Sequence, residues 1–223
     1  DAGISTAQDL GDITAMRRLL EHKTRLLDRR GFGDESREWI ETRLVESRVL
    51  FDAGEVDQGR RAIRRGCEVA GREGWHDLLA DALVLRAFLC REEGRMEEAL
   101  GDLERARELY ETVGDPAGAA ECDHKQGIIF ERLGEYDEAE AHYRKAARAY
   151  DAIGEMFDAL NAGRWIVYPY IYRGELEEAR RLAKSFLGRA KRFGSRWVEA
   201  GCLNQLGEIA RYQGAWEEAR TYY

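Results

Sequence analysis

The sequence predicts an all-α protein, a right-handed solenoid of antiparallel helix pairs. A motif of Gly, an apolar residue two positions later and usually Ala three positions after that recurs at a constant interval, starting at Gly54, Gly94, Gly134, Gly174 and Gly214. Between these glycines, as in 117–132 and 136–150, apolar and small residues follow the three- and four-residue spacing of helices, and the chain holds only 2 Pro. Such fixed self-similarity indicates stacked helical repeats.

Composition narrows the classes of partner. The 223 residues are 44% hydrophobic and 35% charged, which suits long solvated helices. The net charge of −8 argues against nucleic acid, whose phosphates need a basic surface, and we expect no membrane partner because no apolar run is long enough. The four cysteines lack CxxC spacing, which predicts reduced thiols and a cytoplasmic location: Cys67, Cys90, Cys122 and Cys202.

Each motif position has a physical role in a helix pair. The Gly ends the first helix, helix A, because it adopts the left-handed conformation at no steric cost. The apolar residue covers the turn. The Ala, as at Ala139, lies where the second helix, helix B, crosses helix A closely. Asp115-Pro116 and Ser195 are suitable starts for the next helices A.

The wider pattern resembles a tetratricopeptide repeat (TPR) array. Relative to the sixth motif residue, that family places a small residue twelve positions before, an aromatic or large one nine before, and further packing residues four and seven after. Here these positions hold Ser47, Ala87, Gly127, Val167 and Gly207; Leu50, Cys90, Phe130, Tyr170 and Ala210; Ile63, Leu103, Tyr143, Ala183 and Tyr223; and Gly66, Ala106, Ala146 and Phe186.

The 40-residue period is longer than the usual repeat of about 34 residues. It resembles the arrays of bacterial signalling proteins, namely MalT-like regulators and TPR regions linked to kinases or STAND ATPases. This resemblance implies a non-catalytic protein–protein interaction module, the sensor or scaffold region of a larger protein, that binds a peptide or protein segment on its concave face. The alternative it implies is a small-molecule (inducer) sensor domain of a MalT-like transcription regulator.

We expect one TPR-like solenoid over 1–223. The chain begins at Asp1 rather than Met and stops at Tyr223 inside a helical pattern, which indicates a fragment of a longer chain. Open terminal helices could then mediate self-association. The expected parts are a lone helix at about 11–29 and repeat units at about 34–73, 75–113, 116–153, 156–193 and 195–223, the last truncated.

No motif indicates catalysis, a cofactor or a metal. Cys122, Asp123 and His124 are consecutive, and neighbours on a helix point in different directions, so they cannot converge on one ion. The Glu pairs at 97–98, 177–178 and 217–218 fall in the first turn of helix B, where the helix dipole favours carboxylates. We therefore predict that the chain is not an enzyme.

A binding groove is predicted along the helices A, on a stripe 18, 15, 11 and 8 positions before the sixth motif residue. The segment RWIVYPYIYRG (164–174) is unusual, because it is rich in aromatic residues and has Pro169 mid-helix, where a kink is expected. It is either a variant core or a ligand-facing patch. The family's carboxylate clamp of Lys and Asn is replaced by Arg164 and Tyr168, although Arg164 with Asn204 could hold an anion. The predicted groove residues are Phe88, Arg91, His124, Ile128, Arg164, Trp165, Tyr168, Tyr172, Asn204 and Arg211.

Overall fold

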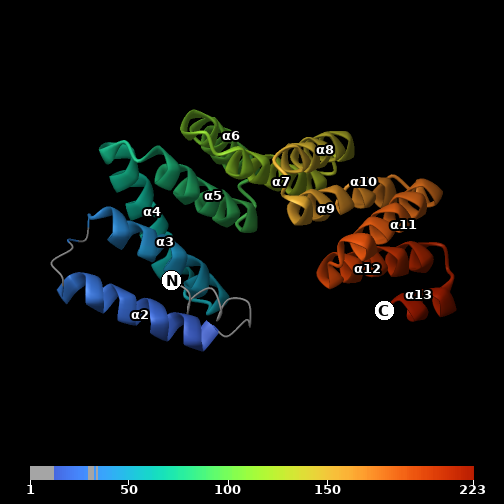
Figure 1. Ribbon diagram of the computed structural model, residues 1–223, viewed down its shortest axis with the longest axis horizontal. Coiled ribbons are helices and arrows are strands. Elements are labelled where there is room, and N and C mark those ends of the chain that lie inside the picture. The colour runs from blue at the N-terminus through green and yellow to red at the C-terminus, as the bar shows by residue number, and fades with distance from the viewer. Residues whose placement is uncertain (1–12, 30–32, 34) are drawn as a thin grey trace. The chain divides into compact units, whose positions relative to one another are not determined.

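The computed structural model describes residues 13–29, 33 and 35–223, and within them it is helical with no strand. The chain forms two compact units, which divide between Gly114 and Asp115 and are described separately (Figure 1). The expected all-α solenoid architecture of stacked helix pairs is confirmed. None of the described helices is long and apolar enough to cross a membrane.

Unit 1 is a stack in which each helix packs against the next. Its first helix falls on the expected lone helix, of which residues 11 and 12 lie outside the described residues. Its helices are α2 (Ile13–Arg29), α3 (Arg37–Asp52), α4 (Val56–Glu73), α5 (His76–Glu92) and α6 (Met96–Val113).

Unit 2 follows the same order of helices A and B, with one helix A split in two. It contains α7 (Pro116–Leu133), α8 (Tyr136–Ala152), α9 (Met156–Arg164), α10 (Val167–Tyr172), α11 (Leu176–Phe193), α12 (Arg196–Tyr212) and α13 (Trp216–Tyr222).

A glycine with positive φ turns the chain at a constant interval along the sequence. The left-handed glycines that the motif predicts at the ends of the helices A are confirmed, with φ of 79° at Gly54 and 74° at Gly214. The helices B end the same way, at Gly74, Gly114, Gly154 and Gly194, with φ between 71° and 83°. The true period of the turn is thus half the period of the motif.

The expected helix starts are also confirmed. The side chain of Asp115 accepts a hydrogen bond from the backbone N–H of Gly118 at 2.9 Å, and Pro116 occupies the first turn, where its missing N–H costs nothing. Ser195 accepts from Val198 N at 3.3 Å. Both caps satisfy a backbone N–H that has no partner inside the helix.

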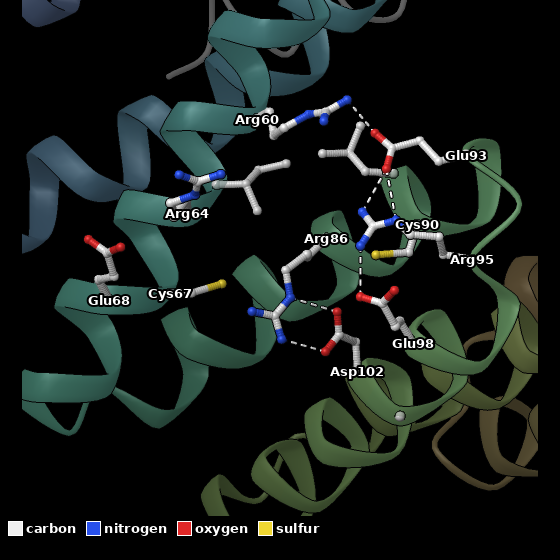
Figure 2. A pocket seen from close by; sticks show the side chains of 13 residues that line it. Arg60, Arg64, Cys67, Glu68, Arg86, Cys90, Glu93, Arg95, Glu98 and Asp102 are labelled. Atoms are coloured by element: carbon white, nitrogen blue, oxygen red, sulfur yellow. Dashed lines mark hydrogen bonds and ion pairs between the residues drawn. The ribbon is translucent and has the colours of Figure 1, made fainter.

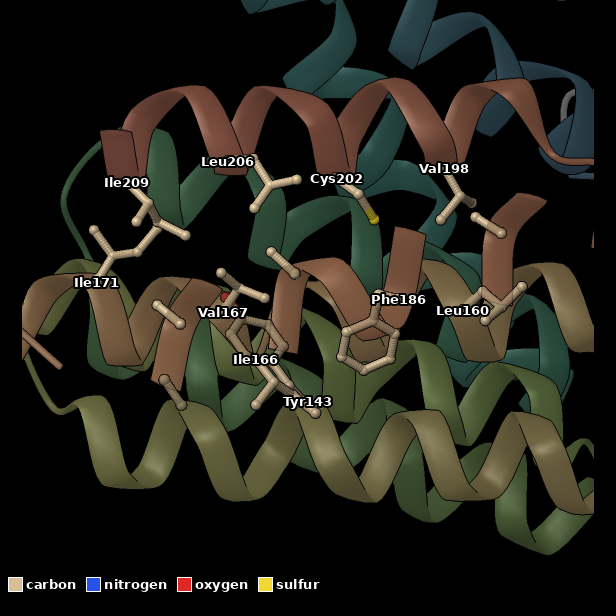
Figure 3. Packing of buried hydrophobic residues seen from close by; sticks show 14 residues of the cluster. Tyr143, Leu160, Ile166, Val167, Ile171, Phe186, Val198, Cys202, Leu206 and Ile209 are labelled. Atoms are coloured by element: carbon tan, nitrogen blue, oxygen red, sulfur yellow. The ribbon is translucent and has the colours of Figure 1, made fainter. Parts of the chain in front are cut away.

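Small and large residues face one another inside each helix pair. A Cβ added at Gly127 would lie 2.6 Å from a ring carbon of Tyr143, so this glycine makes room for the tyrosine. The fourth repeat reverses the sizes: Val167 and Ala183 are both fully buried in the core of unit 2 (Figure 3). The larger valine is therefore matched by a smaller partner, and the volume of the pair is conserved.

The break between α9 and α10 follows from Pro169. Proline has no N–H, and its ring clashes with the carbonyl four residues earlier, which belongs to Trp165. The chain responds with tight turns, in which Ile166 N donates to Gly163 O and Tyr168 N donates to Trp165 O, each at 3.1 Å. The expected kink is thus present as a break between α9 and α10.

Replacing Ala139 by Leu should destabilise unit 2 by about 1–3 kcal/mol, because Ala139 is fully buried and extra methyl groups overpack the crossing. Chemical denaturation measures the loss. The matched control is Ala141→Leu, at an exposed position of the same helix, which should change stability by less than about 0.5 kcal/mol. Tyr168→Ala should still fold. Equal stabilities of Ala139→Leu and the control would contradict the close crossing.

The size match should appear as energetic coupling. Gly127→Val and Tyr143→Ala should each destabilise, by overpacking and by a cavity respectively. Together they recreate the pairing of Val167 with Ala183, so the double variant should recover about 1 kcal/mol or more relative to the sum of the single losses. Urea unfolding of wild type, the two single variants and the double variant measures the coupling energy. If the double variant loses as much stability as the two single variants together, the sizes do not compensate.

Candidate binding face of unit 2

An aromatic row crosses the helix A side of unit 2. Consecutive ring centroids are 5.3 Å apart between Trp165 and Tyr168, 6.1 Å between Tyr168 and Tyr172, and 5.5 Å between Tyr172 and Tyr136. Tyr172 is 44% exposed, whereas Trp165 and Tyr168 are half-buried against the core. In the segment 164–174, Val167 and Ile171 are core, as expected of a variant core, while the aromatic row reaches the surface at Tyr172.

Arg164 lies at one end of the row and is only 6% exposed. Its guanidinium is held between two indole rings, 5.1 Å from the ring centroid of Trp165 and 5.0 Å from that of Trp197. Nε donates to Asn161 Oδ1 at 3.1 Å. An added Cβ at Gly201 would lie 2.8 Å from Cζ, so this glycine leaves the space that the guanidinium fills.

Arg164 is a buried cation without a carboxylate partner among the described residues. Burial lowers its pKa, and the neighbours that oppose this effect are Tyr168 and Cys202 rather than an acid. Burying a charge is costly unless it is paired. The two indole faces recover part of that cost through cation–π attraction.

Two carboxylates lie beside Tyr168 and Tyr172 of the row. Glu131 accepts a hydrogen bond from Tyr143 Oη at 3.0 Å, and burial together with the nearby charge of Glu208 raises the pKa of Glu131 to about 7. Burial also raises the pKa of Glu208, against the opposing effect of Arg211. The nearby positive charges are Arg132 for Glu131 and Arg211 for Glu208, and each lowers the pKa of its glutamate less than burial raises it.

His124 is held against the row by its ring. Its centroid is 5.9 Å from Trp165 and 5.7 Å from Tyr143, the latter edge to face. Nε2 is buried with no hydrogen-bond partner in the described part of the chain, and burial lowers the pKa of His124 to about 4. The imidazole is therefore neutral at pH 7, and the described residues contain no cluster of three possible metal ligands.

The structure gathers most of the predicted groove residues of unit 2. His124, Arg164 and Trp165 are in contact, and Asn204 lies near enough to Tyr168 to oppose the rise that burial causes in the pKa of its phenol. Exposed Arg211 stacks over Tyr212, 4.6 Å from its ring centroid. Ile128 instead packs against the core. In unit 1, Phe88 is 39% exposed, and Arg91 lies 4.9 Å from its ring centroid.

Trp197 and Tyr136 were missed by the sequence analysis. Trp197 stands beside the N-cap of α12 and Tyr136 opens α8, so neither falls on the predicted stripe. Glu131, Glu208 and Gly201 are on the stripe, but nothing in the sequence marks them as functional. Ile171 is also on the stripe and is buried, because the break at Pro169 rotates α10.

Unit 1 contains a cavity of about 760 Å³ between α4, α5 and α6 (Figure 2). Several of its charges are paired within the lining. Arg86 donates to both carboxylate oxygens of Asp102, with Nε 2.7 Å from Oδ2, and Arg95 bridges Glu93 and Glu98. Burial raises the pKa of the Cys67 thiol in its wall to about 11, so this sulfur is a poor nucleophile.

Comparison with known proteins agrees with this geometry. Residues 78–152 match the tetratricopeptide repeat family. No curated protein matches the chain. Residues 78–152 are therefore of the TPR type, and the chain shares the fold of known TPR proteins.

Several solved structures share the fold. BtubC from P. vanneervenii is 18% identical, with a TM-score of 0.67 over 99% of this chain and 87% of its own. A Rap protein complexed with competence and sporulation factor is 14% identical, with a TM-score of 0.75 over 99% and 70%. A STAND protein with a TPR sensor, from Pyrococcus horikoshii, is 15% identical, with a TM-score of 0.69 over 97% and 33%. At these identities the likeness shows the fold.

Protonation of His124 should make unit 2 less stable in acid. Its folded pKa of about 4 lies below the ordinary 6.5, so the unfolded chain takes up the proton first, and stability falls as pH decreases from about 6.5 towards 4. His124→Phe keeps an aromatic ring but cannot titrate. Urea unfolding across this window should show wild type losing more stability than the variant, whereas parallel pH profiles would contradict the burial of the imidazole.

Proposed function

We propose that this chain is a non-catalytic interaction module that binds a peptide or protein segment on the face of unit 2 formed by Arg164, the aromatic row and the Glu131–Glu208 pair. The observation that carries the proposal is Arg164, a cation 6% exposed between two indoles with no carboxylate partner in the described chain. A partner that supplies an anionic group would complete this site. Arg, Trp and Tyr are also the residues enriched at binding hot spots.

The comparisons support the biological setting of the proposal. One protein of similar fold was solved in complex with competence and sporulation factor, and another uses TPRs as the sensor of a STAND signalling ATPase. We infer a sensor or scaffold region of a larger bacterial signalling or regulatory protein. The four free cysteines fit a reducing, cytoplasmic location.

A second candidate is small-molecule sensing through the cavity of unit 1. Its volume of about 760 Å³ lies within the range of ligand sites. Most of its charged side chains, such as Arg86 with Asp102, are already paired within the lining, whereas Arg164 has no carboxylate partner among the described residues. A metabolite that stabilises wild type against heat, but fails to stabilise Gly101→Phe, would favour this candidate, because Gly101 lines the cavity and an added Cβ there meets open space.

Selection of wild type against a displayed library of random peptides, followed by calorimetry with the enriched sequences, tests the proposed function. Arg164→Met keeps an apolar stem between the indoles but removes the charge. It should weaken binding of a selected peptide at least about tenfold, since removing one partner of a buried charged contact is expensive.

The matched control is Lys184→Ala, which removes an exposed charge on α11 and should leave affinity unchanged. Circular dichroism and thermal melting confirm that each variant is folded. Failure to enrich any peptide, or full affinity in folded Arg164→Met, would refute the proposal.

A further inference from the structure

We propose that the bound segment carries an acidic and a basic side chain about three residues apart, with the acid on Arg164 and the base between Glu131 and Glu208. This inference rests on the proposed function and specifies its ligand. Arg164 lies between two indoles, with Asn161 as the only hydrogen-bond partner of its guanidinium among the described residues. Glu131 and Glu208 lie beside Tyr168 and Tyr172, although Arg132 and Arg211 are near them.

The anionic group is recognised at the Arg164 end. Nε is held by Asn161, and the two indoles fix the plane of the guanidinium, so the ring contacts orient its remaining donors in advance. A carboxylate accepts two parallel N–H donors from such a planar group. His124, neutral and with Nε2 unpartnered among the described residues, adds no negative charge that would repel it.

The cationic group is recognised at the glutamate end. Tyr168 and Tyr172 lie near both glutamates. Burial, and after it the negative charges of Glu131 and Glu208, raise the pKa of each phenol. An ammonium or guanidinium placed there gains two carboxylates and the faces of the tyrosine rings.

The spacing follows from helix geometry. Gly201, against the guanidinium of Arg164, and Glu208 are seven residues apart on α12, or about 10 Å at 1.5 Å per residue. A peptide in the polyproline II conformation advances about 3.1 Å per residue and presents every third side chain on the same face. Opposite charges three residues apart therefore match the two ends of the face.

Binding of the basic side chain should release a proton. The titratable and charged groups that face Glu131 come from four helices. Tyr143 of α8 donates a hydrogen bond to it, and Tyr168 and Tyr172 of α10 are neutral phenols. Glu208 of α12 is acidic, and Arg132 of α7, on the same helix as Glu131, is the one basic group. With a pKa of about 7, Glu131 is mostly protonated at pH 6 and mostly ionised at pH 8. A cationic ligand selects the ionised form, so affinity rises with pH by about tenfold between these values.

The test uses synthetic peptides acetylated and amidated at their ends, so that only side chains carry charge. Each contains one Asp and one Lys, one to six residues apart, in a background of Ser and Leu, with norleucine replacing Lys in the matched control. Calorimetry with wild type should find the tightest binding near a three-residue separation. It should also find about tenfold tighter binding at pH 8 than at pH 6, and neither effect with norleucine.

Glu131→Gln provides the second arm, because glutamine can still accept the hydrogen bond from Tyr143. It should bind the Lys peptide more weakly and without the pH dependence. If Asp peptides bind through Arg164 but Lys and norleucine peptides bind alike, or if binding to wild type does not change with pH, the inference fails while segment binding stands. If no peptide binds wild type, the inference and the proposed function fail together.

Discussion

The structure depends on one backbone constraint, the left-handed glycine that turns the chain at a constant interval from Gly54 to Gly214. Because the turns are evenly spaced, equivalent positions of successive helices A are always separated by two such intervals. His124, Arg164 and Asn204 are related in this way, and so are Ile128, Tyr168 and Glu208. The even spacing of the turns along the chain thus places these residues, which are distant in sequence, at equivalent positions of three successive helices A.

The same constraint explains how much of the fold the sequence predicts. The turn requires a glycine with φ of about 80°, and this requirement depends only on the backbone at that position. The buried Ala and the small residue opposite a tyrosine depend only on the neighbouring helix of the same pair. All of these positions therefore recur periodically in the sequence. Even the exception can be recognised: Val167 opposite Ala183 conserves the volume that Gly127 opposite Tyr143 occupies. Periodicity specifies the framework because each repeat must meet the same packing condition.

The site was only partly predictable, for a physical reason. Stripe geometry locates positions, and it correctly brought Arg164, Tyr168 and His124 together. It assumes a regular helix, however, and Pro169 interrupts that regularity, so Ile171 turns into the core. The importance of Glu131 comes from its burial and from Glu208 on another helix, and such a tertiary effect leaves no mark on the neighbouring sequence.

Unit 2 keeps three features that a purely structural repeat would avoid: a broken helix, a buried cation without an acid, and two half-buried carboxylates whose pKa values are raised. Each disfavours folding, since unpaired buried charge and a proline inside a helix both raise the free energy of the folded state. In the cavity of unit 1, by contrast, Arg86 is matched with Asp102. Local rules are most often broken where a protein binds something. The three violations lie on one face and along one aromatic row, so a single ligand of opposite charge pattern would account for all of them, whereas drift in the sequence would scatter them over both units.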